Sequence, residues 1–435
     1  MSEIRDLLRE VLAASDRVAA CIEHWSRENY GAGVAAQRLA TLSLEIAKEA
    51  AVRARRRLDE MDAGATISIE AAKALYLHVA SPSDLFELLE HSSRRSLHPV
   101  LSPMVQRQLA MLHIEGDVLV TSIRDVSYEL NPIDEVKHSR LVRTAYLVKR
   151  KPILVFRVPH PPLDRAMHHV LLFHEIGHAV FQSLGIDKSF PIPQELQPAS
   201  TDLTEQFEIR KRQLYYATCA NRWYEELFSD VIGLELAGPA YVFAFFRVLA
   251  GTFGIAPASP THPPTGLRIL LMIRSLEERG LVEPLPNQAK ALLRDWSARV
   301  EKLDTDRAYA SSVKEDGEFS LRLLPILVRE MMSAYSGVRQ EAAAVIPEYT
   351  VVKLAEDLAR GHQLFSRQIP PIEVDTKPTL TGPGTPLDAA RVFAACWCAY
   401  MLSLDSETPL KSETLDKVLL ESLDGAESLR TWREL

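Results

Sequence analysis

Phe173-His174-Glu175-Ile176-Gly177-His178-Ala179 places two histidines four residues apart, with a glutamate directly after the first. On an α-helix, residues i and i+4 share a face and lie about 6 Å apart along the axis, so His174 and His178 can bind one ion. Glu175 is rotated off that line, which places its carboxylate near a metal-bound water without making it a ligand. The stretch predicts a zinc site with its own base. Two histidines satisfied within an ordinary core helix are the alternative.

The residues around this stretch favour a buried amphipathic helix. Apolar and histidine side chains recur at helical spacing from Met167 to Phe181. Asp164 is a candidate N-cap, and Leu184 and Gly185 end the pattern. A zinc ion with three protein ligands lowers the pKa of its water to about 7, and a nearby carboxylate then takes the proton as the water attacks a carbonyl. The segment therefore predicts hydrolytic chemistry in a site shielded from solvent.

A second acidic pair follows downstream. Glu226 and Asp230 are also i and i+4, within a predicted helix from Asp202 to Ala237 that ends at Gly238-Pro239. A catalytic zinc needs a third protein ligand, which Glu226 can supply, and Asp230 can accept the remaining ring N–H of His174. A solvated acidic helix face is the alternative for this pair.

The two motifs together, HEIGH followed by ELFSD, resemble the gluzincin metallopeptidases, the thermolysin-like superfamily. The pattern of that superfamily is HExxH and then ExxxD on a following helix. The resemblance implies a zincin-like fold and a Zn²⁺ cofactor. It also implies zinc ligands His174, His178 and Glu226, a general base Glu175, and an outer partner Asp230.

The choice of ligand and the reach of the resemblance both depend on spacing. Glu225 adjoins Glu226, and only the four-residue offset to Asp230 selects Glu226 as the ligand. The interval from His178 to Glu226 is longer than in thermolysin. The resemblance is therefore to the superfamily and not to that enzyme.

A third segment, Thr261-His262-Pro263-Pro264-Thr265 with Arg268 downstream, is similar to the His-Pro segment of the CAAX-prenyl-processing endopeptidase family. The resemblance implies that His262 lines the cleft and donates to the developing oxyanion, a contact worth roughly 3–4 kcal/mol in other hydrolases. An ordinary turn before a helix is an equally good interpretation. Arg268 either contacts a substrate carboxylate or pairs with an acidic group. Alternative oxyanion donors are Tyr215, Tyr216 and Tyr224, of which Tyr224 is also a candidate substrate contact.

Two β-rich runs precede the histidine motif, at Asp117 to Ser122 and Lys151 to Val158. Zincin-like folds carry a small sheet just before the active-site helix, with its edge strand above the zinc. If Pro152 to Val158 is that edge, an extended peptide can pair with it through main-chain hydrogen bonds. A plain core strand is the alternative.

The rest of the chain is predicted to be helical. Helices are expected at 2–25, 33–62, from Ser81 to about Glu90, 269–276, 289–303, 320–334, 350–359 and 387–402. The fold class is therefore mainly α with a small β-sheet (α+β). The expected domains are a helical region 1–96, a zincin-like metallopeptidase domain 97–285, and a helical region 286–435 with a Pro-rich loop at 368–386.

Composition describes an ordinary globular protein of 435 residues with 47% hydrophobic and 25% charged residues. The formal charge of -8 argues against a nucleic-acid partner. Its four cysteines form no CxxC pair, which favours a reducing compartment, and the N-terminus has no apolar signal segment. The most apolar stretch, Leu236 to Pro257, is interrupted by Gly, Pro and Arg residues, so no membrane span is expected. We predict a cytoplasmic protein.

The function predicted from these features is that of a zinc-dependent metalloendopeptidase acting on a protein or peptide substrate, with Glu175 activating the water. The alternative is a catalytically silent or gated zinc-fold protein that serves as a regulatory or interaction module. The long helical regions on both sides of the motifs are where a regulatory partner would bind. An intact Glu175 argues for catalysis, because a structural zinc has no use for a base.

Overall fold

The computed structural model divides into two compact units, Met1–Asp164 and Arg165–Leu435. It describes residues 2–28, 33–92, 100–123, 128–133, 151–159, 166–186, 188, 190–197, 202–250, 254, 258–283, 285, 287–301, 317–346 and short pieces between 372 and 424. The predicted fold class is confirmed, since the structure is mainly helical with one small mixed sheet. The unit boundary lies inside the region 97–285, so the sheet belongs to the first unit and the histidine motif to the second.

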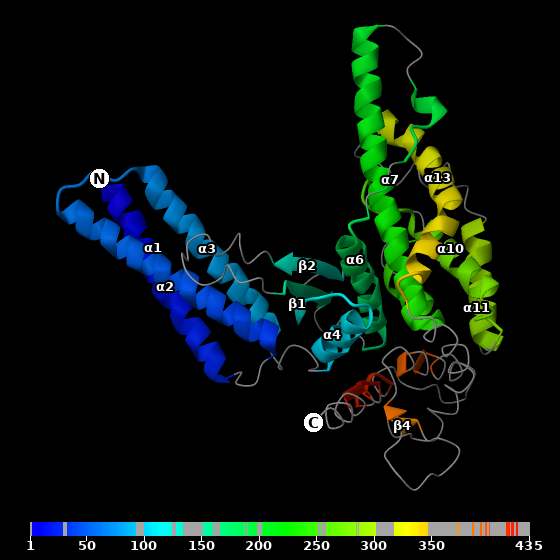
Figure 1. Ribbon diagram of the computed structural model, residues 1–435, viewed down its shortest axis with the longest axis horizontal. Coiled ribbons are helices and arrows are strands. Elements are labelled where there is room, and N and C mark those ends of the chain that lie inside the picture. Colours follow the sequence, from blue (N-terminus) through cyan, green and yellow to red (C-terminus); the bar gives the residue numbers. More distant parts are fainter. Residues whose placement is uncertain are drawn as a thin grey trace. The chain divides into compact units, whose positions relative to one another are not determined.

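The first unit is built on three long helices, α1 (Ser2–Glu28), α2 (Val34–Asp62) and α3 (Ile69–His91) (Figure 1). The helices expected at 2–25 and 33–62 are confirmed, and α1 and α2 pack against each other. Alanines such as Ala50 and Ala54 give α2 a face of small side chains. They are buried in one core cluster with apolar residues of α1 and α3. The helix expected to start at Ser81 starts earlier, because the Ser68 side chain caps α3 by accepting from a backbone N–H at 3.2 Å.

A three-stranded sheet completes the first unit, together with α4 (Leu101–Met111). The strands are β1 (Asp117–Ile123), β2 (Glu129–Ile133) and β3 (Ile153–Pro159), in the order β1-β3-β2, with β3 parallel to β1 and antiparallel to β2. The interpretation of Pro152 to Val158 as an edge strand is therefore wrong. Both edges of β3 are occupied by neighbouring strands, so β3 offers no free edge to a peptide.

The second unit is organised around α7 (Leu203–Ala237), which packs against both α6 (Leu172–Leu184) and α13 (Gly317–Ala343). A 3-10 turn, η2 (Ala166–Leu171), leads into α6. Local sequence signals set the limits of both central helices. Gly185, at φ 59°, ends α6 in the left-handed conformation. Asp202 caps α7 by accepting from a backbone N–H at 2.7 Å, and Gly238, at φ 57°, ends it. The predicted C-terminal end of α6 and both predicted ends of α7 are confirmed. The predicted start of α6 is not, because the α-helix begins at Leu172 after the 3-10 turn, and the expected N-cap Asp164 lies outside the described residues.

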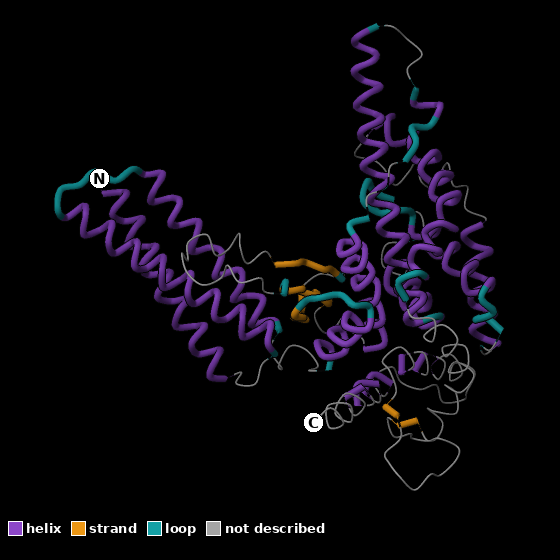
Figure 2. The backbone as a smooth tube through the Cα atoms, in the orientation of Figure 1, coloured by secondary structure: helices purple, strands orange, loops and turns teal. Residues whose placement is uncertain are grey.

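The remaining helices, turns and strands of the second unit can be followed in Figure 2. They are η3 (Gln194–Leu196), α8 (Pro239–Phe245), the π-helical turn η4 (Phe246–Ala250), α10 (Thr265–Glu278), α11 (Asn287–Glu301), β4 (Ile372–Glu373) and β5 (Thr385–Pro386). Within the described helices, none is both long and apolar enough to cross a membrane. The predicted helix at 350–359 and most of the loop at 368–386 lie outside the described residues, although β4 and β5 form an antiparallel pair within that loop.

Candidate metal centre

The candidate metal centre depends on a close approach of α6 and α7. A Cβ atom added at Gly177 would lie 2.4 Å from the Cα atom of Ser229, so only glycine allows the two backbones to meet here. This contact aligns His174 and His178 on α6 with Glu226 on α7. The glycine in the middle of the histidine motif thus has a packing role that the sequence pattern alone does not reveal.

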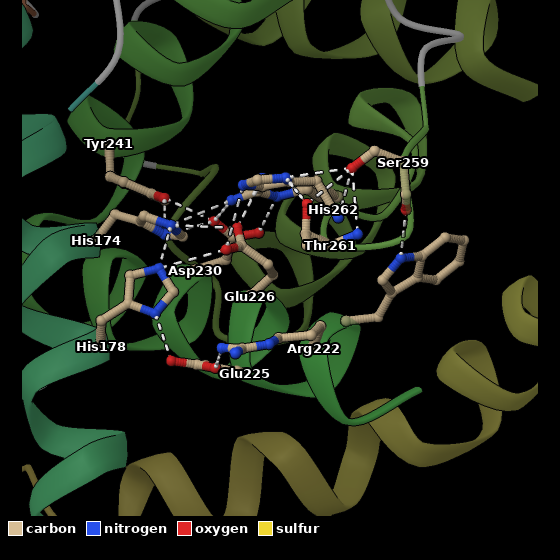
Figure 3. Close-up of polar contacts among 12 residues, drawn as sticks. His174, His178, Arg222, Glu225, Glu226, Asp230, Tyr241, Ser259, Thr261 and His262 are labelled. Atoms are coloured by element: carbon tan, nitrogen blue, oxygen red, sulfur yellow. Dashed lines mark hydrogen bonds and ion pairs between the residues drawn. The ribbon is translucent and has the colours of Figure 1, made fainter. Parts of the chain in front are cut away.

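Three donor side chains converge in this region, namely His174, His178 and Glu226 (Figure 3). The two histidine Nε2 atoms lie 3.2 Å apart. Oε2 of Glu226 lies 3.3 Å from Nε2 of His174, and its Oε1 lies 3.4 Å from Nε2 of His178. In a tetrahedral zinc site with bonds of about 2.0–2.1 Å, donor atoms are roughly 3.3–3.4 Å apart. The two Nε2 atoms are separated by about this distance, each lies near one oxygen of Glu226, and one donor atom from each of the three residues lies within 4.8 Å of the other two.

The electrostatics of the group also suit a cation. The Glu226 side chain is buried, and its Oε2 atom lies 3.3 Å from Nε2 of His174 and 3.1 Å from Nη1 of Arg268. Burial alone would raise the pKa of Glu226, but the charge of Arg268 and hydrogen bonds to both histidines hold it well below its ordinary value. The carboxylate is therefore ionised and ready to bind. Two imidazoles and one carboxylate form a donor set typical of catalytic zinc.

Asp230 lies behind the first histidine. Its Oδ1 atom is 3.1 Å from Nδ1 of His174, the contact that the sequence predicts for it. The Tyr241 hydroxyl donates to the same Oδ1 atom at 2.7 Å and lies 3.2 Å from the same Nδ1. The Tyr241 ring fits here because Gly233 has no side chain. A Cβ atom at Gly233 would lie 2.8 Å from that ring. Sequence reasoning missed Tyr241, which lies beyond the break between α7 and α8.

Arg268 does not face a substrate. Its side chain is 4% exposed, and its Nε and Nη2 atoms donate to both oxygens of Asp230 at 2.7 Å each. Its Nη1 atom lies 3.1 Å from Oε2 of Glu226. The interpretation of Arg268 as a substrate contact is therefore replaced by the alternative, in which it pairs with acidic groups. Buried carboxylates require such a partner because an unpaired buried charge is costly.

Glu225 and Glu226 are distinguished clearly by their contacts. Glu226 reaches the Nε2 atoms of both histidines, as a ligand must, whereas Oε1 of Glu225 lies 3.1 Å from the opposite ring nitrogen, Nδ1 of His178. Arg222 donates to the other oxygen of Glu225 at 3.2 Å. Glu226, the residue that the four-residue offset selected, is therefore the one of the two glutamates that belongs to the group able to hold a metal ion.

Glu175 is buried beside the donor group and is 5% exposed. Burial raises the pKa of its carboxyl above the ordinary value, although positive charge at His174 and His178 partly offsets the effect. A carboxyl of raised pKa is a better proton acceptor than an ordinary one once it is ionised. Its place in the site is compatible with the predicted role of general base, which remains a proposal.

His262 lies at the rim of the donor group, in the turn before α10. Its Nδ1 atom is 2.8 Å from Oγ1 of Thr261 and 3.3 Å from Oγ of Ser259, and its Nε2 atom is 3.5 Å from Oε1 of Glu226. The side chain is 59% exposed, and partial desolvation of the ring by its neighbours lowers the pKa of the imidazole below its ordinary value, so the ring is neutral at neutral pH. The turn expected before the helix is present, and the predicted role of His262 in lining a cleft stays a prediction.

The predicted tyrosine donors are not brought to the donor group. The Tyr224 hydroxyl donates to Glu341 on α13 at 2.8 Å. Tyr216 is fully buried, and the charges acting on its hydroxyl come from Glu330, Arg329 and Glu195. Tyr215 lines a shallow apolar depression with Trp223 and Ser259. The proposed role of Tyr224 in substrate binding therefore has no support in these contacts.

Comparison with protein-family models, curated proteins and solved structures gave no match for this chain. The site is consequently interpreted from its own geometry. What the fold and the site define is a mainly helical protein in which a buried His-His-Glu group can hold a metal ion.

Proposed function

We propose that the protein is a zinc-dependent metalloendopeptidase of the gluzincin type, with a protein or peptide substrate. The observation that carries this proposal is the convergence of His174, His178 and Glu226, whose donor atoms lie within 4.8 Å of one another, with Glu175 buried beside them. Three protein ligands leave one position of a tetrahedral ion for water or substrate, which is the arrangement of catalytic zinc sites. Structural zinc sites usually have four protein ligands.

Each chain residue then has a chemical task. The ion, when bound, supplies Lewis-acid catalysis and lowers the pKa of water. Glu175 accepts the proton from the attacking water and delivers it to the leaving amine. Neutral His262 is exposed and carries a ring nitrogen 3.5 Å from the Glu226 carboxylate, where it can donate to the oxygen that becomes negative during attack. Asp230 accepts from His174 and so fixes the direction of that ring.

The competing proposal is a regulatory module that binds zinc without catalysis. The helices α1 to α3, which lie outside the unit containing the metal centre, give such a module surface for a partner. The buried Glu175 favours the enzyme. Burial of a carboxyl that binds no metal costs free energy, and a structural zinc site has no use for such a group.

Glu175→Gln tests the proposal. This variant should retain about one equivalent of zinc and lose cleavage, which can be followed by proteome-wide mapping of new peptide ends in cells that carry the wild type or the variant. Glu205→Gln, in the first turn of α7, is the matched control and should cleave like the wild type. A zinc-loaded wild type whose peptide ends match those of Glu175→Gln would favour the regulatory module.

A further inference from the structure

Both candidate histidine ligands have a carboxylate behind them, and only one of these carboxylates belongs to the ExxxD pattern. Asp230 lies behind His174, and Glu225 lies 3.1 Å from Nδ1 of His178 (Figure 3). We propose that Glu225, held by Arg222, is a positioning residue that orients His178 for the metal. This inference rests on the proposed metal site and extends it to two residues for which the motifs provide no role.

The geometry gives Glu225 this role because the two ring nitrogens of His178 face different groups. Nε2 points toward His174 and Glu226, at 3.2 and 3.4 Å, and Nδ1 points toward Glu225. An imidazole that binds a metal through Nε2 keeps its proton on Nδ1, from which it donates to Glu225. Such a bond fixes the tautomer and the plane of the ring, and it makes Nε2 a stronger donor to the ion.

The same contacts exclude Glu225 as a fourth ligand. Its Oε1 atom is committed to the outer nitrogen of His178, and its Oε2 atom accepts from Arg222 at 3.2 Å. Both oxygens thus face away from the point where the Nε2 atoms and Glu226 converge. Glu225 therefore acts through His178 and not on the ion itself.

The two carboxylate–histidine pairs differ in how firmly they are held. The Asp230 side chain is 1% exposed and is fixed by two hydrogen bonds from Arg268. The Glu225 side chain is 12% exposed, and its partner Arg222 is 61% exposed. Exposed ion pairs contribute little and are screened by salt. The orientation of His178 should consequently depend on ionic strength, whereas that of His174 should not.

Zinc affinity of the purified full-length chain, measured by competition with a chromophoric chelator, tests the assignment without reference to cleavage. Glu225→Ala should weaken zinc binding about 10- to 100-fold. Glu225→Gln keeps an oxygen that can accept a hydrogen bond from Nδ1 of His178. It should therefore lose less zinc affinity than Glu225→Ala. Glu205→Gln removes an exposed carboxylate from the same helix and should bind zinc like the wild type.

Arg222→Ala provides a second test that does not disturb the buried residues. It should weaken zinc binding about two- to fivefold at low salt, and the difference from the wild type should shrink at high salt. The visible spectrum of bound Co²⁺ should keep its band positions in every variant, because no ligand is lost.

Three results would overturn the assignment. The first is a zinc affinity of Glu225→Ala that stays within about twofold of the wild type. The second is a changed Co²⁺ spectrum in a Glu225 variant, which would mark Glu225 as a ligand. The third is a zinc affinity of Arg222→Ala that equals that of the wild type at low salt. If Glu225→Ala fails to fold, the zinc affinities of Arg222→Ala at low and high salt decide whether the assignment holds. A protein that binds zinc as expected but cleaves nothing would remove the peptidase proposal and leave this inference intact.

Discussion

Gly177 of α6 and Ser229 of α7 approach so closely that a Cβ atom at position 177 would lie 2.4 Å from the Ser229 Cα atom. This backbone contact sets the separation of the helix that carries both histidines from the helix that carries Glu226. A larger residue at position 177 must push the helices apart, and the three donor atoms would then no longer meet at one point.

Gly177→Ala should therefore lower both the free energy of unfolding and the zinc affinity. Overpacking of this kind costs about 1–3 kcal/mol, measured by urea unfolding of the metal-free protein. Gly337→Ala is the matched control, because Gly337 also lies in a helix, α13, and a Cβ there meets nothing within 4 Å. That control should be neutral or slightly stabilising. Equal stability and zinc affinity in the two variants would contradict the packing role of Gly177.

Arg268→Met should be among the most destabilising single substitutions in the second unit. It leaves Asp230 and Glu226 buried without their cationic partner, and the removal of one member of a buried ion pair costs about 3–5 kcal/mol. Arg268→Lys should rescue only part of the loss, since an ammonium group cannot donate to both Asp230 oxygens in parallel. Arg274→Met, on the same helix but 46% exposed, is the control. Denaturant midpoints that agree for Arg268→Met and Arg274→Met would refute this account.

Zinc binding should release protons at neutral pH. In the metal-free protein, burial lowers the pKa of His178, but hydrogen bonds to Glu225 and Glu226 outweigh burial and raise it to about 10. An imidazole must be unprotonated at the metal-binding nitrogen, so zinc affinity should rise with pH up to about 10. Calorimetry in buffers of different ionisation enthalpy measures the number of protons released, and a heat independent of buffer would contradict the charge state proposed for His178.

The stability of the metal-free protein should have the opposite pH dependence. A group whose pKa is raised by folding stabilises the fold at pH values below its unfolded pKa, near 6.5, and this stabilisation is lost as the pH rises through about 10. The Tm of the metal-free protein should fall across this interval, and the gain in Tm on adding zinc should widen. Differential scanning fluorimetry with and without zinc checks both trends. A rise in Tm on adding zinc that is the same at every pH would contradict them.

The limits of the central helices could be predicted because their signals are local. Asp202, Gly185 and Gly238 act within one turn of their own helix ends, where capping and left-handed conformations are determined by residue type. The pairs at i and i+4 are similarly local, which is why His174 and His178 could be paired from their spacing alone. Their convergence with Glu226 followed from the motif resemblance.

The features that could not be predicted depend on distant parts of the chain. The order of the strands puts β3 in the centre of the sheet because β2, for which the sequence carries no clear strand pattern, pairs with its second edge. Tyr241 and Arg268 reach Asp230 only after α8 and α10 pack under α7. A sequence pattern can indicate that Arg268 has an acidic partner or a substrate, but only the packed structure decides between them.

The most direct test of the metal centre is the zinc content of the protein purified without chelators, compared with that of His174→Ala. The account predicts about one zinc per chain in the wild type and little in the variant, because His174 is one of only three converging donors among the described residues. Less than about half an equivalent in the wild type, or equal zinc in the two proteins, would contradict the site.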